Sequence, residues 1–331
     1  MRYLVTGASG FLGGHLVDRL LEAGHPVRAH VLEPDAASRL EARGVEVRRS
    51  DLVQDGDLAP WLEGVDVVVH CAGIAAQRAA REDIWRVNVE GTKTLLAQCT
   101  RAGISRFVYI SSVAVYGHAP PPVSEDAPQR PVNLYGESKR AAEEILFRCH
   151  SESGLPAVVL RPCLIYGERD RRLPRFLVRM SRLPFLPLPH GGRRAVALVH
   201  VSDVVQAILA ASTSPRAAGS AYNVTDGELH TYRDVLDRLR EITGKRPRIV
   251  PIPGAVFHAG LKVVLGLARR GRWGKSADAS RDDLSESLRV FDLDSIYSIE
   301  KARKDLGFTP RVGLAEGLER TLAFCREANG P

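Results

Sequence analysis

The first 110 residues alternate short apolar runs with amphipathic segments. Runs rich in β-branched residues, such as "RYLVTG" and "VDVVVH", predict strands, whereas "HLVDRLLEAG" and "NVEGTKTLLAQCTRAG" carry apolar positions at helical spacing. This alternation is typical of a parallel sheet with helices on both faces. The nearly continuous apolar character of "VDVVVH" and "RFVYIS" indicates strands that are buried on both sides.

The pattern beyond this region predicts one more helix and one more interior strand. Residues 134–149 follow Asn133, a favoured capping residue, and carry an apolar stripe at helical spacing. The run "AVVLRPCLIYG" predicts a further strand, after which "ERDRRLPRFLVRMSRLPFLPLPHGG" is rich in Pro and Arg and has poor strand character. We expect a second, smaller domain to begin there, and "AVALVHVSDVVQAILAA" to form a strand and helix that return to the first domain.

Composition narrows the classes of function. The 331 residues are 44% hydrophobic, which is enough for a sizeable core, and the net charge of +7 is dispersed rather than grouped with aromatic residues. We therefore expect no nucleic-acid partner. The five cysteines form no C-x-x-C pair, so we expect reduced thiols and neither a disulfide framework nor a metal site. No run of about 18 apolar residues could cross a bilayer and the chain enters a strand at once, so we expect a cytoplasmic protein.

Three glycines lie between the first predicted strand and the first helix. In "LVTGASGFLGGHLVDRLLEAG", Gly7, Gly10 and Gly13 are spaced as G-x-x-G-x-x-G. Such glycines allow a tight turn, a close approach of backbone N–H groups to a pyrophosphate, and close packing of helix on strand. Because this loop opens the first unit of a long βαβ series, it predicts dinucleotide binding rather than an ordinary turn.

Further motifs in the same order resemble the extended short-chain dehydrogenase/reductase family, of the NAD-dependent epimerase/dehydratase type. They are "HCAGIA" at 70–75, "NVEGT" at 88–92, "SSVAVYG" at 111–117, "YGESK" at 135–139, "RPCLIYG" at 161–167 and "VHVSDV" at 200–205. The resemblance spans essentially the whole chain and is nearest to the 3β-hydroxysteroid dehydrogenase-like branch. It implies an α/β fold, a doubly wound Rossmann sheet with a smaller, mostly helical C-terminal substrate domain.

The resemblance also implies domain limits and cofactor contacts. We expect residues 1–166 with 195–225 to form the dinucleotide-binding domain, and residues 167–194 with 226–331 to form the substrate-binding domain. The expected cofactor contacts come from the glycine loop, from strand ends and from the later motifs: Gly7, Gly10, Phe11, Leu12, Gly13, Asp51, Leu52, Cys71, Ala72, Gly73, Asn88, Tyr135, Lys139 and Leu164.

Tyr135 and Lys139 are four residues apart, so they point the same way on the predicted helix. A free phenol has a pKa of about 10, and a nearby ammonium group together with an oxidised nicotinamide would favour the phenolate and lower that value. The resemblance adds that Lys139 holds the nicotinamide ribose and that Ser112 hydrogen-bonds the reacting oxygen. Taken alone, the Tyr/Lys pair would be an ordinary solvated helix face, and Ser111 is an ordinary strand serine.

The choice between NAD and NADP depends on the end of the second strand. Family members that use NAD place an acid there, and users of NADP place an arginine beside it. In "RAHVLEPD", Val31 and Leu32 stand at these two positions, so neither marker is present. Glu33 would lie on the same side as Val31 if the strand continued, and it would then reach the ribose. We therefore favour NAD, with NADP as the alternative and a solvated turn as the other interpretation of Glu33.

The substrate is expected to be a small, apolar molecule. Nucleotide-sugar enzymes of the family carry an Asn and an Arg where this chain has Leu164 and Val196, and both differences remove polar contacts to a diphosphate. An apolar pocket would fit Leu164 together with Phe176, Phe185, Leu186 and Leu188, although each residue taken singly is better explained as ordinary domain core. Arg193 and Arg194 could still hold an anionic group, which keeps the sugar alternative open.

The segment 255–272, "AVFHAGLKVVLGLARRGR", is an apolar run that ends in basic residues. It could form a lid over the substrate, a peripheral membrane contact, or a plain packed helix or dimer surface. The family resemblance also implies a homodimer.

Three functions therefore remain. The first is an NAD(P)-dependent oxidoreductase acting on a hydroxysteroid-like or β-hydroxy/β-keto acid-like substrate. The second is a nucleotide-sugar 4-epimerase or dehydratase with tightly bound NAD, and the third is a non-catalytic dinucleotide sensor. The Ser112, Tyr135 and Lys139 set disfavours the sensor, because a sensor needs no proton transfer.

Overall fold

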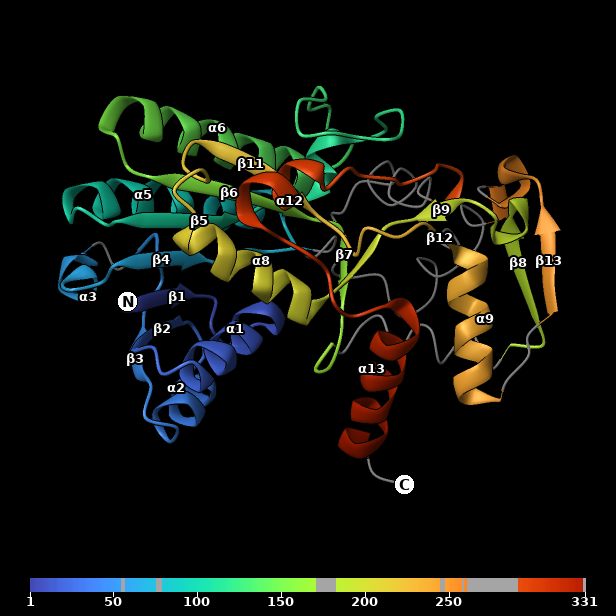
Figure 1. Ribbon diagram of the computed structural model, residues 1–331, viewed down its shortest axis with the longest axis horizontal. Coiled ribbons are helices and arrows are strands. Elements are labelled where there is room, and N and C mark those ends of the chain that lie inside the picture. The colour runs from blue at the N-terminus through green and yellow to red at the C-terminus, as the bar shows by residue number, and fades with distance from the viewer. Residues whose placement is uncertain are drawn as a thin grey trace.

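A seven-stranded parallel sheet forms the centre of the molecule (Figure 1). The computed structural model describes residues 1–54, 57–75, 79–170, 183–244, 248–257, 259–260 and 291–329. The strands follow the order β3-β2-β1-β4-β5-β6-β11, which is the order of a doubly wound Rossmann sheet. They are β1 (Tyr3–Thr6), β2 (Val27–Val31), β3 (Glu46–Arg49), β4 (Val67–His70), β5 (Arg106–Ile110), β6 (Ala157–Pro162) and β11 (Ser220–Val224). The predicted fold class is confirmed.

Helices cover both faces of this sheet, as the apolar strands require. One face packs against α1 (Phe11–Glu22), α2 (Pro34–Glu41), α8 (Val201–Thr213) and α12 (Glu300–Leu306). The other packs against α3 (Ala59–Leu62), α5 (Gly91–Arg101) and α6 (Leu134–Ser153). Every residue of β1 and β4 is buried, because these strands lie in the interior of the sheet between both helical layers.

The helix that carries Tyr135 and Lys139 begins where the sequence predicts. The Asn133 side chain accepts a hydrogen bond from the Gly136 N–H at 2.8 Å, which caps the first turn of α6. The helix continues to Ser153, four residues beyond the predicted end, and stops at Gly154 in the left-handed conformation, with φ of 73°. Two short helical elements precede α6 on the same side of the sheet. They are η1 (Arg86–Glu90), which follows α4 (Arg81–Trp85), and η2 (Val113–Tyr116).

The run "AVVLRPCLIYG" forms two strands rather than the single strand expected. The first part is β6 of the central sheet, whereas β7 (Leu164–Tyr166) leaves the sheet and pairs in parallel with β10 (Leu198–His200). The returning segment likewise joins β7 instead of the central sheet, and α8 then brings the chain back onto the sheet. The last central strand is therefore β11.

A second hydrophobic core lies beside the first. It combines side chains of β7, β8 (Phe185–Pro189), β9 (Ala195–Val196), β10, α9 (Tyr232–Thr243) and α13 (Leu314–Asn329). Two more strand pairs border it, because β9 pairs with β12 (His230–Thr231) and β8 pairs with β13 (Arg248–Ile252). Helices α9, α12 and α13 dominate the described chain after residue 226, in agreement with the predicted helical C-terminal portion, while the exact domain limits stay a prediction.

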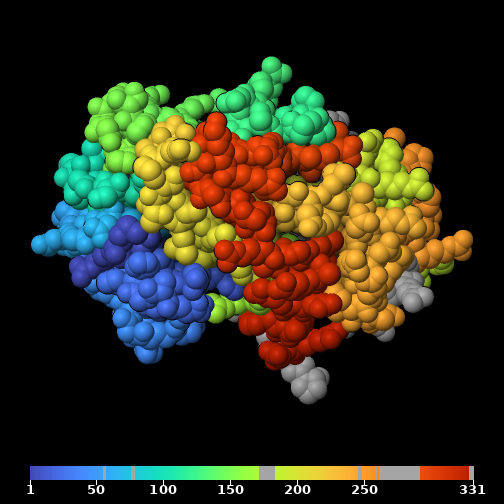
Figure 2. Space-filling model, in the orientation of Figure 1, coloured from blue at the N-terminus to red at the C-terminus, as the bar shows by residue number. Residues whose placement is uncertain are grey.

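The C-terminal segment connects the two cores. Figure 2 shows it in red across the middle of one face, between the blue and green N-terminal part and the orange region around α9. Phe308 is fully buried in the first core and Leu318 is buried in the second. Between them, the Asp203 carboxylate of α8 accepts hydrogen bonds from the N–H groups of Arg311 at 2.9 Å and Val312 at 3.1 Å. This segment therefore fixes the position of one core relative to the other.

No helix among the described residues is long and apolar enough to cross a membrane. Most of the segment 255–272, interpreted above as a lid, a membrane contact or a packed helix, lies outside the described residues.

Candidate active site

A cleft of about 2030 Å³ opens at the carboxyl ends of the central strands. Its lining includes the glycine loop after β1, the end of β5 and the start of α6, and on the opposite side residues of β7, β9, β10 and α9. In doubly wound folds, ligands bind at this edge of the sheet, where the strand order reverses. Here the reversal falls between β1 and β4, which are adjacent in the sheet.

The glycine loop has the geometry that a dinucleotide requires. Gly7 has φ of 66°, and a Cβ atom there would lie 2.7 Å from the backbone nitrogen of Ala72. A Cβ atom on Gly13 would collide with the Gly7 carbonyl oxygen, so α1 can approach the loop this closely only with glycine at that position. Gly10 is the N-cap of α1. The first turn of α1 carries no acidic residue, and the free N–H groups of this turn favour an anion. Phe11 and Leu12 also line the cleft.

Ser112, Tyr135 and Lys139 meet in the cleft. Ser112 lies two residues beyond the end of β5 and is the N-cap of η2. Its Oγ accepts a hydrogen bond from the Ala114 N–H at 3.1 Å. The Lys139 Nζ donates a hydrogen bond to the Ile110 carbonyl oxygen at 2.8 Å and lies 5.9 Å from the centre of the Tyr135 ring. Lys139 is only 5% exposed, which rules out the solvated helix face as a description of this residue.

The electrostatics of the pair differ from the expectation. Burial raises the pKa of Tyr135 to about 12, and an interaction with the Ser112 side chain is the influence that lowers it. Burial also lowers the pKa of Lys139 to about 8, so its ammonium group is itself disfavoured. Lys139 therefore does not produce a low phenol pKa by its position alone. Stabilisation of the phenolate stays a prediction for the complex with an oxidised nicotinamide.

A chain of hydrogen bonds supports the loop after β4. The Ala72 N–H donates to Thr6 Oγ1 at 3.3 Å, and Thr6 Oγ1 lies 2.6 Å from His70 Nδ1. On the other side of the ring, His70 Nε2 lies 2.9 Å from Thr92 Oγ1, whose hydroxyl donates to the Asn88 carbonyl oxygen at 2.7 Å. Because the Thr92 hydroxyl is used as a donor, His70 must carry a proton on Nε2, and Nδ1 of the neutral ring can then accept from the Thr6 hydroxyl. Burial lowers the pKa of His70 to about 3, which agrees with this assignment.

This histidine predicts a loss of stability in acid. Because unfolded His70 binds a proton below pH of about 6.5 and folded His70 does not until about 3, the free energy of unfolding should fall as the pH drops through that window, by up to about 1.4 kcal/mol per pH unit. Urea unfolding of wild type and His70→Gln at several pH values in this window measures the pH dependence of the free energy of unfolding. The variant should show the shallower dependence, and equal slopes would contradict the assignment.

The predicted cofactor contacts divide into two groups. Gly7, Gly10, Phe11, Leu12, Gly13, Cys71, Gly73 and Leu164 line the cleft with Tyr135 and Lys139. The others are not part of its lining: Ala72 supports Gly7, Leu52 is buried in the core, and the Asp51 carboxylate pairs with Arg86 at 2.8 Å. Asn88 is also buried, where it accepts from the Ile74 N–H at 2.7 Å and donates to Ser138 Oγ at 2.9 Å. Asn88 thus joins the loop after β4 to the helix that carries Lys139.

Glu33 lines the cleft, but not as a strand residue. Strand β2 ends at Val31, and Glu33 is the N-cap residue of α2. Its carboxylate accepts a hydrogen bond from Ser9 Oγ of the glycine loop at 3.5 Å. The expected continuation of the strand is therefore wrong, although the carboxylate still faces the loop.

A buried ionic network behind α6 was not predicted. Glu143, one turn after Lys139, forms an ion pair with Arg161 of β6 at 2.6 Å, and both side chains are at most 3% exposed. Arg161 also donates to the Tyr116 hydroxyl at 2.7 Å, and Tyr116 donates to Asn223 Oδ1 at 2.8 Å. The network ties α6 to strands β6 and β11. A charged residue within an otherwise apolar strand, Arg161 in "VVLRP", was the available signal.

The side of the cleft opposite the glycine loop is largely apolar. Leu164 is 47% exposed and Val196 is buried, and both line the cleft with Leu198, Val235 and other apolar side chains. Of the residues expected in an apolar pocket, Leu186 and Leu188 instead pack in the second core and Phe185 is exposed. They alternate along β8, so its two faces meet different surroundings. Phe176 lies outside the described residues.

Comparisons with known proteins agree with this architecture. The sequence model of the NAD dependent epimerase/dehydratase family matches residues 3–225. The chain is 32% identical over 330 residues to the 4-hydroxy-2-methyl-3-oxo-4-farnesyl-3,4-dihydroquinoline-1-oxide ketoreductase of Stigmatella aurantiaca, covering 96% of this chain and 95% of that protein. It is 30% identical to the decarboxylating sterol-4-alpha-carboxylate 3-dehydrogenase of Mus musculus, and the match covers 96% of this chain and 89% of that protein. Among solved structures, MoeE5 in complex with UDP-glucuronic acid and NAD is 27% identical, with a TM-score of 0.75 and coverage of 99% and 100%.

Proposed function

Because the chain belongs to the NAD-dependent epimerase/dehydratase family, we propose that it is an oxidoreductase that interconverts a secondary alcohol and a ketone on an apolar substrate. The observation that carries this proposal is that Ser112, Tyr135 and Lys139 line one cleft whose far side is largely apolar. The names of the ketoreductase and the sterol dehydrogenase support the same substrate class.

NAD is the cofactor we propose. The glycine loop, with its close approach to Ala72 and the free N–H groups of α1, fits the pyrophosphate. Glu33 supports NAD over NADP, because a carboxylate accepts hydrogen bonds from a ribose diol and repels a 2′-phosphate. The NAD bound to MoeE5 and the family's name point the same way. When bound, the nicotinamide supplies or accepts the hydride.

The residues of this chain would supply the proton and the orientation. Ser112 and the Tyr135 hydroxyl both hydrogen-bond the substrate oxygen, which holds the reacting carbon in place. Tyr135 removes the hydroxyl proton during oxidation and returns it during reduction. Lys139, fixed by the Ile110 carbonyl, stabilises the phenolate and holds the nicotinamide ribose. The buried Glu143–Arg161 pair positions α6 and therefore both residues.

The second candidate is a nucleotide-sugar epimerase or dehydratase. The likeness to MoeE5 in complex with UDP-glucuronic acid favours it, and Arg194 lines the same cleft. Such an enzyme retains its NAD and returns it to its starting state, whereas a dehydrogenase consumes it. The apolar residues Leu164 and Val196 disfavour this alternative.

A substrate screen distinguishes the two candidates. We expect net formation or loss of reduced nicotinamide, followed by its absorbance, when the purified protein is mixed with NAD or NADH and sterols or β-hydroxy and β-keto acids. NADP and NADPH, tested in parallel, should support the slower reaction. Conversion of a nucleotide sugar to its isomer with no net change in reduced nicotinamide would contradict the proposal and establish the epimerase.

A further inference from the structure

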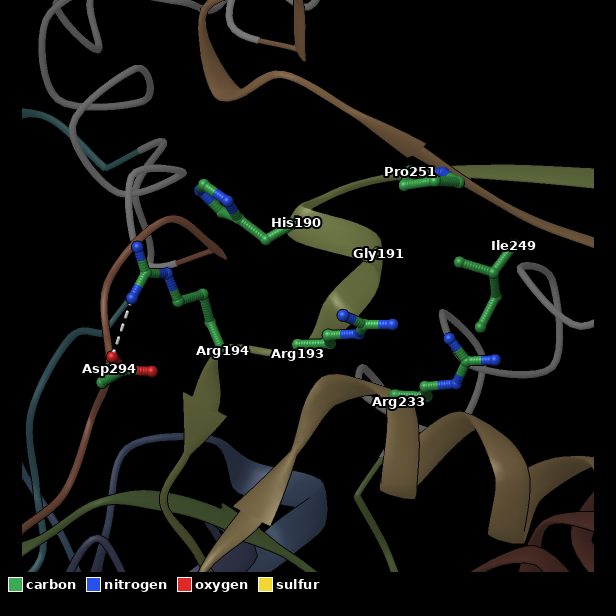
Figure 3. Close-up of a pocket in the computed structure, with 8 residues that line it drawn as sticks. All are labelled: His190, Gly191, Arg193, Arg194, Arg233, Ile249, Pro251 and Asp294. Carbon is green, nitrogen blue, oxygen red and sulfur yellow. Dashed lines mark hydrogen bonds and ion pairs between the residues drawn. The ribbon is translucent and has the colours of Figure 1, made fainter.

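A second cavity, of about 590 Å³, lies beside the cleft and is rich in arginine. Figure 3 shows its lining, which we call the arginine pocket: His190, Gly191, Arg193, Arg194, Arg233, Ile249, Pro251 and Asp294. Arg194 and Asp294 also line the large cleft, so the two cavities are neighbours that share one ion pair. This pocket is separate from the glycine loop and from Tyr135.

The turn η3 (His190–Gly192) directs two consecutive arginines to opposite sides. His190, Gly191 and Gly192 all have positive φ, of 52°, 65° and 73°. Figure 3 shows Arg194 extending toward Asp294, whereas Arg193 extends toward Ile249, on the same side as Arg233 of α9. Two guanidinium groups from different elements therefore enter the pocket from one side.

The acidic residues around the pocket neutralise these two arginines only in part. Asp294 is used by Arg194 at 2.9 Å and by the Ala195 N–H at 2.8 Å. Asp237 forms ion pairs with Arg240 at 2.5 Å and with Arg233 at 3.8 Å, so Arg233 shares this carboxylate.

Arg193 is exposed and has no ion pair among the residues that the structure describes. Arg193 lacks a carboxylate partner and Arg233 shares Asp237 with Arg240, so an oxyanion placed between the two guanidinium groups would supply the negative charge that this side of the pocket lacks. Ile249 and Pro251 add an apolar wall to the pocket, while Arg193 and Arg233 are both accessible to solvent.

We propose that the arginine pocket binds an anionic group, a phosphate or a carboxylate, at the far end of the substrate whose alcohol or ketone lies at Tyr135. Guanidinium groups match the oxygens of both groups in bidentate fashion. The cavity is large enough for the anion and part of the chain that carries it. The substrate class is thus an apolar molecule with a distal negative charge. Only the identity of the molecule that carries the anion rests on the proposed function.

Binding of inorganic pyrophosphate to the protein saturated with NAD tests the pocket. Saturation matters because the glycine loop would otherwise bind the probe. By isothermal titration, Arg193→Gln and Arg233→Gln should each weaken binding at least about tenfold. Arg238→Gln is the matched control, since Arg238 lies on the same helix outside the pocket and pairs with Glu241 at 2.7 Å. It should bind as wild type does.

Equal affinity of wild type and Arg193→Gln, or no binding at millimolar pyrophosphate, would overturn the assignment. The titration needs no turnover, so it also separates this inference from the proposed function. If Tyr135→Phe binds pyrophosphate normally but also retains full turnover, the pocket stands and the proposed function fails.

A kinetic measurement identifies the source of the anion. Pyrophosphate should inhibit turnover competitively with the substrate, because the probe and the anionic end of the substrate occupy the same pocket. Arg233→Gln should reduce this inhibition at least about tenfold, in line with its effect on binding. Inhibition that is non-competitive with the substrate would show a separate anion and overturn the assignment to the substrate.

Discussion

Replacing Tyr135 with phenylalanine should lower kcat by a factor of about 10² to 10⁴ and leave the affinity for NAD almost unchanged. The substitution removes one hydroxyl from a partly buried side chain at the cleft and keeps the ring against the side chains around it. Steady-state kinetics with the substrate found in the screen, together with NAD titration by fluorescence, measure both quantities.

Tyr3→Phe is the matched control for this experiment. Tyr3 is a buried tyrosine at the start of β1, at the opposite end of the strand from the glycine loop. Its loss of a hydroxyl should leave kcat as in wild type. Equal kcat for Tyr135→Phe and Tyr3→Phe would show that the tyrosine of α6 is not the proton donor.

Replacing Glu143 with alanine should lower the free energy of unfolding by about 3–5 kcal/mol, because it leaves the buried guanidinium group of Arg161 without its carboxylate. The second carboxylate near this network, Glu125, has its Oε1 engaged by the Asn223 N–H at 2.8 Å and would not replace Glu143. Urea denaturation at neutral pH measures the difference.

The neighbouring Glu144 provides the control, since it lies on the same helix and pairs with Arg140 at 3.0 Å on the surface. Glu144→Ala should cost less than about 1 kcal/mol, because exposed ion pairs are screened by water. Similar losses for the two variants would contradict a special role for the buried pair. Replacing both Glu143 and Arg161 by apolar residues of similar volume should recover much of the stability, since no uncompensated charge then remains.

Local patterns predicted the elements whose structure is decided locally. The cap at Asn133, the glycine turn at Gly7 and the fully buried strand β4 depend on neighbouring residues and on apolar runs, and all are present. The division of "AVVLRPCLIYG" was not predictable in this way. Both halves are apolar, and only the partner strand decides that β7 pairs with β10 after Pro162, whereas β6 stays in the sheet.

The candidate site shows the same division between local and distant causes. Tyr135, Lys139 and Ser112 were identified from spacing and resemblance, and the fold brings them into one cleft. The raised pKa of Tyr135 follows from burial, which no motif encodes. Likewise, the adjacent Arg193 and Arg194 gave no sign that, after the positive φ angles at His190, Gly191 and Gly192, their side chains would extend to opposite sides of the turn.

The path of the C-terminal segment has a consequence for synthesis in the cell. Phe308 completes the first core and Leu314, Leu318 and Leu322 complete the second, so a nascent chain on the ribosome leaves apolar faces of both cores uncovered until these residues emerge. Chains in that state expose the surfaces that chaperones bind and that lead to aggregation. Production of this protein should therefore be sensitive to translation speed and chaperone supply, even though the finished molecule holds its two cores firmly together.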